Sequence, residues 1–195
     1  MDLLQTTLTC AFTRWSPGLG DNHPVGWLTV LVYLAAGIAS ARAALCCGRE
    51  GTEALERRFW WITAAILLIL AVNKQLDLQS LLTMVARCHA SLAGWYDDRR
   101  GIQRAFIFLV AGGGIAFLGL LALLLRRILG RIWLALAGLA FVCSFVVIRA
   151  ASFHHMDGLI GSVALGVKVN WLLELPGPLL VLAVAFRRRR AVRST

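Results

Sequence analysis

Residues 59–77 read FWWITAAILLILAVNKQLD, and this stretch decides the class of the fold. It opens on three aromatic residues and continues through an apolar run that ends at Asn73. A helix rises about 1.5 Å per residue and the hydrocarbon core of a bilayer is about 30 Å thick, so an apolar run of this length suits a membrane crossing. Aromatic residues are enriched where such a helix enters the membrane. We therefore expect a transmembrane helix over 59–75.

The composition of the whole chain supports a membrane protein. Of its 195 residues, 59% are hydrophobic and only 15% are charged, which is more apolar residue than a soluble core of this size uses. Further apolar runs predict an all-α fold, a polytopic transmembrane helical bundle of about five spans. It forms a single membrane domain over 1–195. The expected spans are about 24–46, 59–75, 105–125, 132–150 and 168–186.

Two segments differ from a simple span. Between about 76 and 93, apolar residues recur at helical spacing among polar ones, which predicts an outer amphipathic helix on the membrane surface or across the end of the bundle. Residues 158–167 contain glycines and precede Lys168. A re-entrant or tilted segment at 158–167 is therefore the main alternative to a simple count of five.

The distribution of arginine predicts the orientation. The 47–58 loop, the 126–131 connection and the tail after Phe186 hold most of the positive charge in short connections, and five spans place all three on one side. Cytoplasmic loops carry the excess of Lys and Arg, so we expect the amino terminus outside and the carboxyl terminus in the cytoplasm. All but two of the 20 basic residues are arginine, which favours a bacterial inner membrane.

The net charge of +10 raises the question of nucleic acid binding. The basic residues lie at the ends of apolar runs, most densely at Arg187 to Arg190, where they act as topology signals and contacts for anionic lipids. The expected partners are therefore the lipid bilayer, other membrane subunits or a lipid-like ligand. We expect no nucleic acid partner.

The five cysteines show no spacing typical of a metal site. Cys46 and Cys47 fall at the inner end of the first span, where a cytoplasm keeps thiols reduced. Cys10 and Cys88 fall in outer segments, where an oxidising compartment would allow a disulfide between them. We expect unpaired thiols, with the disulfide as the alternative.

Helical rise brings polar residues of three spans to a common depth. Counted from the inner boundary of each span, six side chains lie about 18 to 27 Å up, in the outer half of the membrane. They are Asn73, Lys74, Asp77, Arg149, Asn170 and Glu174. This outer polar layer is the candidate site.

Glu174 is the most informative residue of the layer, because an ionisable group in the hydrocarbon core is costly and faces the bundle interior or a wet cavity. Pro176-Gly177-Pro178 follow it, and the two prolines lack the N–H that would continue the helix. We expect a kink or break that frees carbonyl acceptors, as in the broken helices that line transporter sites. Glu174 then either forms a structural ion pair with Lys74 or Arg149, or belongs to a ligand or ion site.

The third span contains Gly112-Gly113-Gly114 near the same depth. Small residues allow close helix approach in membranes, so we expect these glycines to pack against another helix. Space for a ligand or a hinge is the alternative.

His154, His155 and Asp157 are residue types that bind divalent metals such as Zn²⁺. No metalloprotease spacing accompanies them, and we favour an interfacial polar cluster. A divalent metal cofactor is the alternative for this group.

No nucleotide-binding or hydrolase motif is present, so function rests on the outer polar layer. The leading hypothesis is a small inner-membrane protein acting as a binding or accessory subunit through the layer around Glu174. The alternative is an outer-facing enzyme for a lipid or lipid-linked substrate, with Asp77 and the 154–157 cluster as metal ligands or as acid and base. A transporter is the third hypothesis, although the inner halves of the spans are too apolar for a continuous polar path.

Overall fold

The computed structural model describes residues 2–15, 24–94, 99–151, 163–164, 167–168 and 173–193; for residues 79, 99–107, 110, 111, 149–151, 163–164, 167–168 and 190–193 it describes the backbone alone. Within these ranges the chain is helical apart from one short pair of strands, which confirms the all-α class. The elements are α1 (Leu3–Arg14), α2 (Pro24–Cys46), α3 (Gly51–Leu76), α4 (Leu78–Leu92), α5 (Arg99–Leu124), α6 (Leu129–Ala151), β1 (Val163–Ala164), β2 (Val167–Lys168) and α9 (Pro176–Arg193).

Three helices are long and apolar enough to cross a membrane. They are α2, α3 and the Leu129–Ile148 part of α6. Helix α2 has the bounds expected for the first span, because its apolar run is uninterrupted from Pro24 to Cys46. Helix α3 begins at Gly51 rather than near Phe59, so most of the expected 47–58 loop continues the spanning helix.

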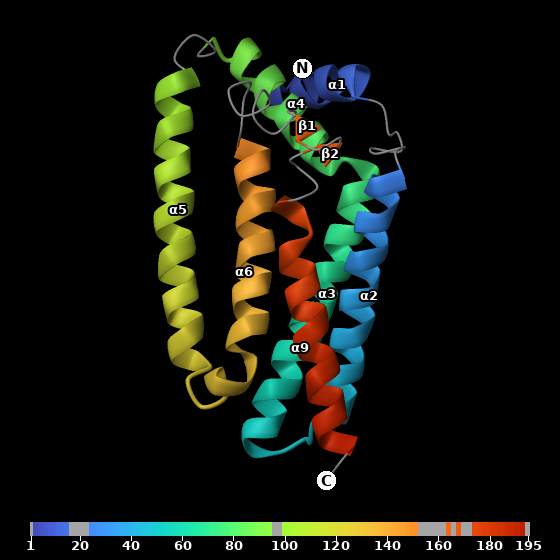
Figure 1. Ribbon diagram of the computed structural model, residues 1–195. Coiled ribbons are helices and arrows are strands. Elements are labelled where there is room, and N and C mark those ends of the chain that lie inside the picture. The colour runs from blue at the N-terminus through green and yellow to red at the C-terminus, as the bar shows by residue number, and fades with distance from the viewer. Residues whose placement is uncertain are drawn as a thin grey trace.

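The long helices run side by side, with α1 and α4 across one end and the carboxyl terminus at the other (Figure 1). We call these the outer end and the inner end. Helix α2 packs against α3 and α9, and α9 also packs against α6, whereas α5 contacts α6 at the edge of the bundle. Helix α4 is the amphipathic helix expected within 76–93, and it lies across the bundle rather than along it (Figure 1).

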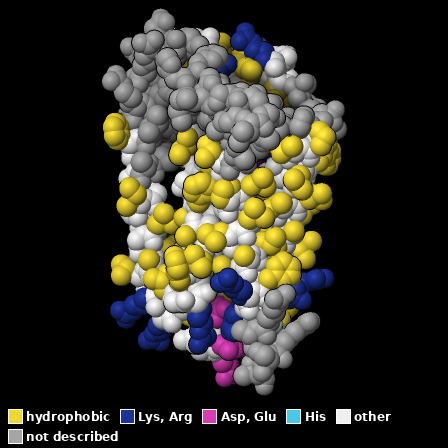
Figure 2. All heavy atoms as spheres, in the orientation of Figure 1, with side chains coloured by type: hydrophobic (Ala, Val, Ile, Leu, Met, Phe, Trp, Pro, Cys, Tyr) yellow, Lys and Arg dark blue, Asp and Glu magenta, His cyan; other side chains and the backbone are white. Residues whose placement is uncertain are grey.

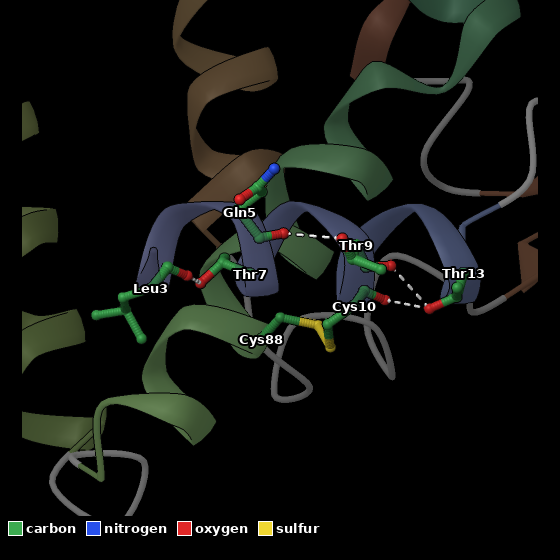
Figure 3. The surroundings of a disulfide bond; sticks show 7 residues. All are labelled: Leu3, Gln5, Thr7, Thr9, Cys10, Thr13 and Cys88. Carbon is green, nitrogen blue, oxygen red and sulfur yellow. Dashed lines mark hydrogen bonds between the residues drawn. A yellow bond between two sulfur atoms is a disulfide. The ribbon is translucent and has the colours of Figure 1, made fainter. Parts of the chain in front are cut away.

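A disulfide joins the two helices of the outer end. Cys10 of α1 and Cys88 of α4 are bonded, with their Cα atoms 6.1 Å apart (Figure 3). The expectation of unpaired thiols is wrong for this pair. Helix α1 carries no long apolar run and was not predicted, yet it packs on α4 and buries Thr7 and Ala11. That packing brings the two cysteines together.

Small side chains allow α2 to pack closely on α3 and α9. Ala36, Ala39 and Ala43 are at most 4% exposed, and small residues let neighbouring helices approach closely. Large side chains of α3 fill the remaining space, with Trp60 and Leu67 completely buried. The core is therefore built from alanines on one helix and bulky residues on its neighbours.

Helices α6 and α9 meet at two glycines. A Cβ added to Gly138 would lie 2.8 Å from the carbonyl oxygen of Gly177, and a Cβ added to Gly177 would lie 2.8 Å from that of Gly138. Both distances are shorter than side chains tolerate, so only glycine permits this helix crossing. The crossing lies next to Pro178, which is fully buried.

The packing expected for Gly112-Gly113-Gly114 is not found among the described residues. Nothing lies within 4 Å of a Cβ built at any of the three, and all three are exposed. Their neighbour Ile115 is also 73% exposed. The triplet is exposed because α5 stands at the edge of the bundle, where α6 is its main neighbour among the described elements (Figure 1).

The helix expected at 168–186 begins at Pro176. Lys168 instead belongs to β2, where it pairs antiparallel with Val163 of β1. The described residues of 158–167 belong to this strand pair, and the expected re-entrant or tilted segment stays a prediction. Leu173 and Glu174 are helical, the chain bends at Leu175, and α9 begins at Pro176, so the chain breaks here as expected. Proline suits the first position of a helix, where its missing N–H has no partner to lose.

The glycine crossing gives a testable prediction. Gly138→Ala should lower the free energy of unfolding by about 1 to 3 kcal/mol, because α6 and α9 must separate to admit the methyl group. Gly119→Ala on α5 is the matched control, since a Cβ there meets nothing within 4 Å. It should leave stability unchanged or raise it by up to about 1 kcal/mol. Unfolding by SDS titration in mixed micelles measures both, and equal effects would contradict the crossing.

Candidate functional site

A buried ion pair joins the end of α3 to the start of α9. The Lys74 Nζ lies 2.6 Å from the Glu174 Oε2, and the two side chains are only 7% and 4% exposed. Lys74 is one of the two cations expected to face Glu174. The other, Arg149, lies on α6 with its side chain outside the described set.

The turn before α9 positions the carboxylate. The chain bends at Leu175, and the Leu179 N–H donates to the Leu175 carbonyl at 3.1 Å to close the first turn of the helix. Pro178 has no N–H to donate to the Glu174 carbonyl. Glu174 therefore lies at the break between the helical residues Leu173 and Glu174 and the start of α9, and from there its side chain reaches Lys74 of α3.

A pocket surrounds this pair at the outer end of the bundle. It holds about 330 Å³ of empty space, part of it open to the surroundings. Only about 20 Å³ of it is enclosed room for a water-sized molecule, enough for about one water, so a larger ligand would have to enter from the open side. Four elements line it, through Tyr33 of α2, Leu70, Asn73, Lys74 and Asp77 at the end of α3, Phe145 and Val146 of α6, and Glu174 before α9. The pocket is polar along α3 and apolar along α6.

Asp77 is both a pocket residue and the joint between two helices. Its φ of 48° is left-handed, a conformation that Asp adopts more readily than most residues. This single residue turns the chain from the spanning helix α3 into α4. Its Oδ2 accepts a hydrogen bond from the Ser80 Oγ at 2.6 Å, which fixes the carboxylate at the edge of the pocket.

Four of the six residues of the expected outer layer come together in this pocket: Asn73, Lys74, Asp77 and Glu174. Asn170 and the expected metal cluster of His154, His155 and Asp157 lie outside the described residues. Across the part of the chain that is described, no group of three His, Cys, Asp or Glu side chains could hold a metal ion. What the described pocket offers is recognition by charge and hydrogen bonding.

A second buried carboxylate lies at the inner end and was missed by the sequence analysis. Glu56 is completely buried, and Arg188 donates to it twice, from Nε to Oε1 at 2.6 Å and from Nη2 to Oε2 at 3.2 Å. The Trp60 Nε1 donates to Oε1 at 3.3 Å, and the Arg131 Nη1 lies 3.6 Å from Oε2. This inner cluster ties α3, α6 and α9 together.

The signal for the inner cluster was present in the sequence but masked by its surroundings. Glu56 lies within GREGTEALERR, whose mixed charges are typical of a surface segment. It is also four residues before Trp60, and side chains at that spacing share a helix face. Trp60 is completely buried, so the aromatic start of the span is interfacial only at Trp61, which is 44% exposed.

The inner cluster changes the acidity of its members. Burial alone would lower the pKa of Arg188, but the hydrogen bonds and negative charge of Glu56 outweigh it and raise the pKa above its ordinary value. Burial raises the pKa of the nearby Cys47 to about 11, with the charge of Glu56 adding to the effect and Arg188 opposing it. Cys47 is therefore a protonated thiol at neutral pH and a poor nucleophile.

Comparison with known proteins gives no information on function, so the function is argued from the structure. No protein-family model, curated protein or solved structure matches the chain. The pocket around Lys74 and Glu174 is therefore interpreted from its own chemistry.

The ion pair gives a prediction for stability. Removing one member leaves the other charge buried without its partner, so Lys74→Met and Glu174→Gln should each cost about 3 to 5 kcal/mol. The double variant removes both charges and should recover most of that loss, which appears as a coupling energy in a double-mutant cycle. SDS titration in micelles measures all three variants. Additive single effects would show that the two side chains do not interact.

Proposed function

We propose that the protein is a small polytopic protein of the bacterial inner membrane and acts as a binding or accessory subunit. Its pocket around Lys74 and Glu174 takes the polar head group of a lipid or of a lipid-like ligand. The observation that carries this proposal is a pocket with two opposite charges, both almost completely buried, at the outer end of spanning helices. Ionisable groups at such a depth are costly and commonly mark functional sites.

The shape and lining of the pocket support a lipid-like ligand. The polar residues of α3 lie opposite the apolar Phe145 and Val146 of α6. A lipid shows the same division between a polar head group and apolar acyl chains. The long helices also present a broad band of apolar side chains to their surroundings (Figure 2). A bilayer lipid could therefore place its head group between the charges while its chains stay in the membrane.

We propose five membrane spans. They are the three helices that are long and apolar enough to cross a membrane, together with α5 and α9. Helix α5 extends from Arg99 to Leu124, a rise of about 39 Å that exceeds the hydrocarbon thickness. The apolar part of α9, from Pro176 to Phe186, rises about 15 Å. Leu173 and Glu174, which are helical before the bend at Leu175, extend that crossing toward the outer end.

The proposed orientation rests on the disulfide at the outer end and on the basic side chains at the inner end. Disulfides persist in oxidising compartments, and the Cys10–Cys88 bond lies at the outer end, whereas Cys46 and Cys47 are free thiols at the inner end. Lys and Arg side chains gather at the inner end below the apolar band (Figure 2). Exposed arginines there include Arg58, Arg126, Arg127, Arg131 and Arg187. Both features favour an outer end outside the cytoplasm.

Thiol labelling tests the orientation. Intact cells treated with a membrane-impermeant maleimide should show no labelling before reduction, and labelling of Cys10 and Cys88 after mild reduction. Cys10→Ser/Cys88→Ser is the control, and it should stay unlabelled in both conditions. Labelling of the control variant from outside would place Cys46 or Cys47 on the outer side and contradict the proposed topology.

Lipid retention tests the binding function. Protein extracted in mild detergent should keep about one lipid molecule per chain, detected by native mass spectrometry. Lys74→Met/Glu174→Gln removes both pocket charges without leaving either unpaired, so it should fold and lose the lipid. Glu50→Gln, at an exposed acidic position of the inner end, is the control and should keep it. Equal retention by all three proteins would contradict binding in this pocket.

A further inference from the structure

We infer that the pocket selects a ligand with a primary ammonium group, and specifically a zwitterionic head group in which that ammonium lies close to a phosphate. This inference rests on the proposed function and names its ligand class. It follows from the balance of hydrogen-bonding groups around Glu174.

The described lining of the pocket contains more hydrogen-bond acceptors than the Lys74 ammonium can contact at one time. Its lining includes the carboxylates of Glu174 and Asp77 and the side-chain amide of Asn73, against the single ammonium of Lys74. One positive and two negative charges leave the described lining with a net charge of −1. An additional cation is therefore favoured there, whereas an anion alone is not.

The acceptors are arranged around a common region. Asn73 lies in the last turn of α3 and Asp77 follows the end of that helix, and both line the pocket together with Glu174. Lys74 already reaches Glu174 at 2.6 Å from the same helix end. The cation that Glu174 binds in the structure is the alkylammonium group of Lys74, which has three N–H donors and a compact charge. Lys74 thus occupies the place that a ligand ammonium would take.

Exchange of partners lets such a ligand enter without leaving a buried charge alone. A ligand ammonium takes over Glu174, with Asp77 and Asn73 as further acceptors, and Lys74 is released to pair with the ligand phosphate. Every charge keeps an opposite charge, which avoids the cost of an unmatched buried ion. The apolar residues Phe145 and Val146 then face the carbon atoms of the ligand.

The same argument excludes two common head groups. A glycerol head group with one phosphate gives Lys74 a new partner but leaves Glu174 without a cation. A choline head group carries a positive charge but no N–H, so it cannot donate to the three acceptors. The expected order of preference is therefore ethanolamine over choline and over glycerol head groups.

The test uses the full-length protein in nanodiscs that contain equal amounts of phosphatidylethanolamine, phosphatidylcholine and phosphatidylglycerol. Native mass spectrometry of the released protein should show the ethanolamine lipid enriched about tenfold over the choline lipid among bound molecules, equivalent to about 1.4 kcal/mol. Equal retention of the three lipids would overturn the inference while leaving the binding function intact. Absence of any retained lipid would instead contradict the proposed function.

Asp77→Asn is the variant that isolates the ammonium site. Asn also tolerates a left-handed backbone and can still accept from Ser80, so the joint between α3 and α4 should remain. The variant should retain lipid but lose most of the preference for ethanolamine over choline, whereas Glu50→Gln should keep it. An unchanged preference in Asp77→Asn would overturn the assigned role of the acceptors.

A soluble competitor shows whether the ligand is a membrane lipid or a soluble amine. Glycerophosphoethanolamine is added to protein that holds the ethanolamine lipid, with glycerophosphocholine as the control. Release by the ethanolamine compound alone would show that the head group suffices and that a soluble amine can be the ligand. Retention against both would show that the acyl chains are needed and that the ligand is a membrane lipid. Equal release by both compounds would contradict ammonium selectivity.

Discussion

A carboxylate buried among membrane helices must find its counter-charge inside the protein, and this constraint organises the bundle. Helix α3 supplies Lys74 at the outer end and Glu56 at the inner end, while the α9 segment supplies Glu174 and Arg188. The two connections have opposite polarity. At one end α3 brings the cation and at the other it brings the anion.

This reciprocal arrangement fixes how α3 and α9 lie along each other. Both helices pack on α2, and the two ion pairs join them directly. Sliding one helix by a turn would separate both pairs at once, and rotation would expose the charges to lipid. Apolar packing alone discriminates poorly between such registers, because lipid chains are as apolar as the helix surfaces. The charges therefore select the register of α3 and α9. The alanine-rich core and the Gly138–Gly177 crossing then allow the helices to pack closely in that register.

The two ends differ in what they can do. The inner carboxylate is saturated by two donors from Arg188 and one from Trp60, with Arg131 nearby, so it is suited to a permanent structural role. The outer carboxylate is held by Lys74 in a pocket that also contains Asn73 and Asp77. A pair with further acceptors beside it can exchange partners, and this is the physical basis for assigning ligand binding to the outer end.

The sequence predicted the features that depend on one helix at a time. The apolar run of α2 predicted its bounds, and helical rise alone placed Lys74 and Glu174 at one depth. Among contacts between segments, it predicted the pairing of Glu174 with Lys74 or Arg149 but not the packing of α1. Helix α1 has no long apolar run, and its disulfide to Cys88 depends on packing against α4. The prolines after Glu174 predicted a kink or break, and the structure places it at Leu175, with α9 beginning at Pro176.

The central claim is that Glu174 is an ionised carboxylate held by Lys74 within the bundle. Infrared difference spectroscopy between the wild type and Glu174→Gln, in lipid at neutral pH, measures the state of this one group. The account predicts that the substitution removes a carboxylate stretching band. In the Lys74→Met background it predicts that this band is shifted, because the hydrogen bond from the Lys74 ammonium is lost. A protonated acid band for Glu174 in the wild type, or no dependence on Lys74, would contradict the account.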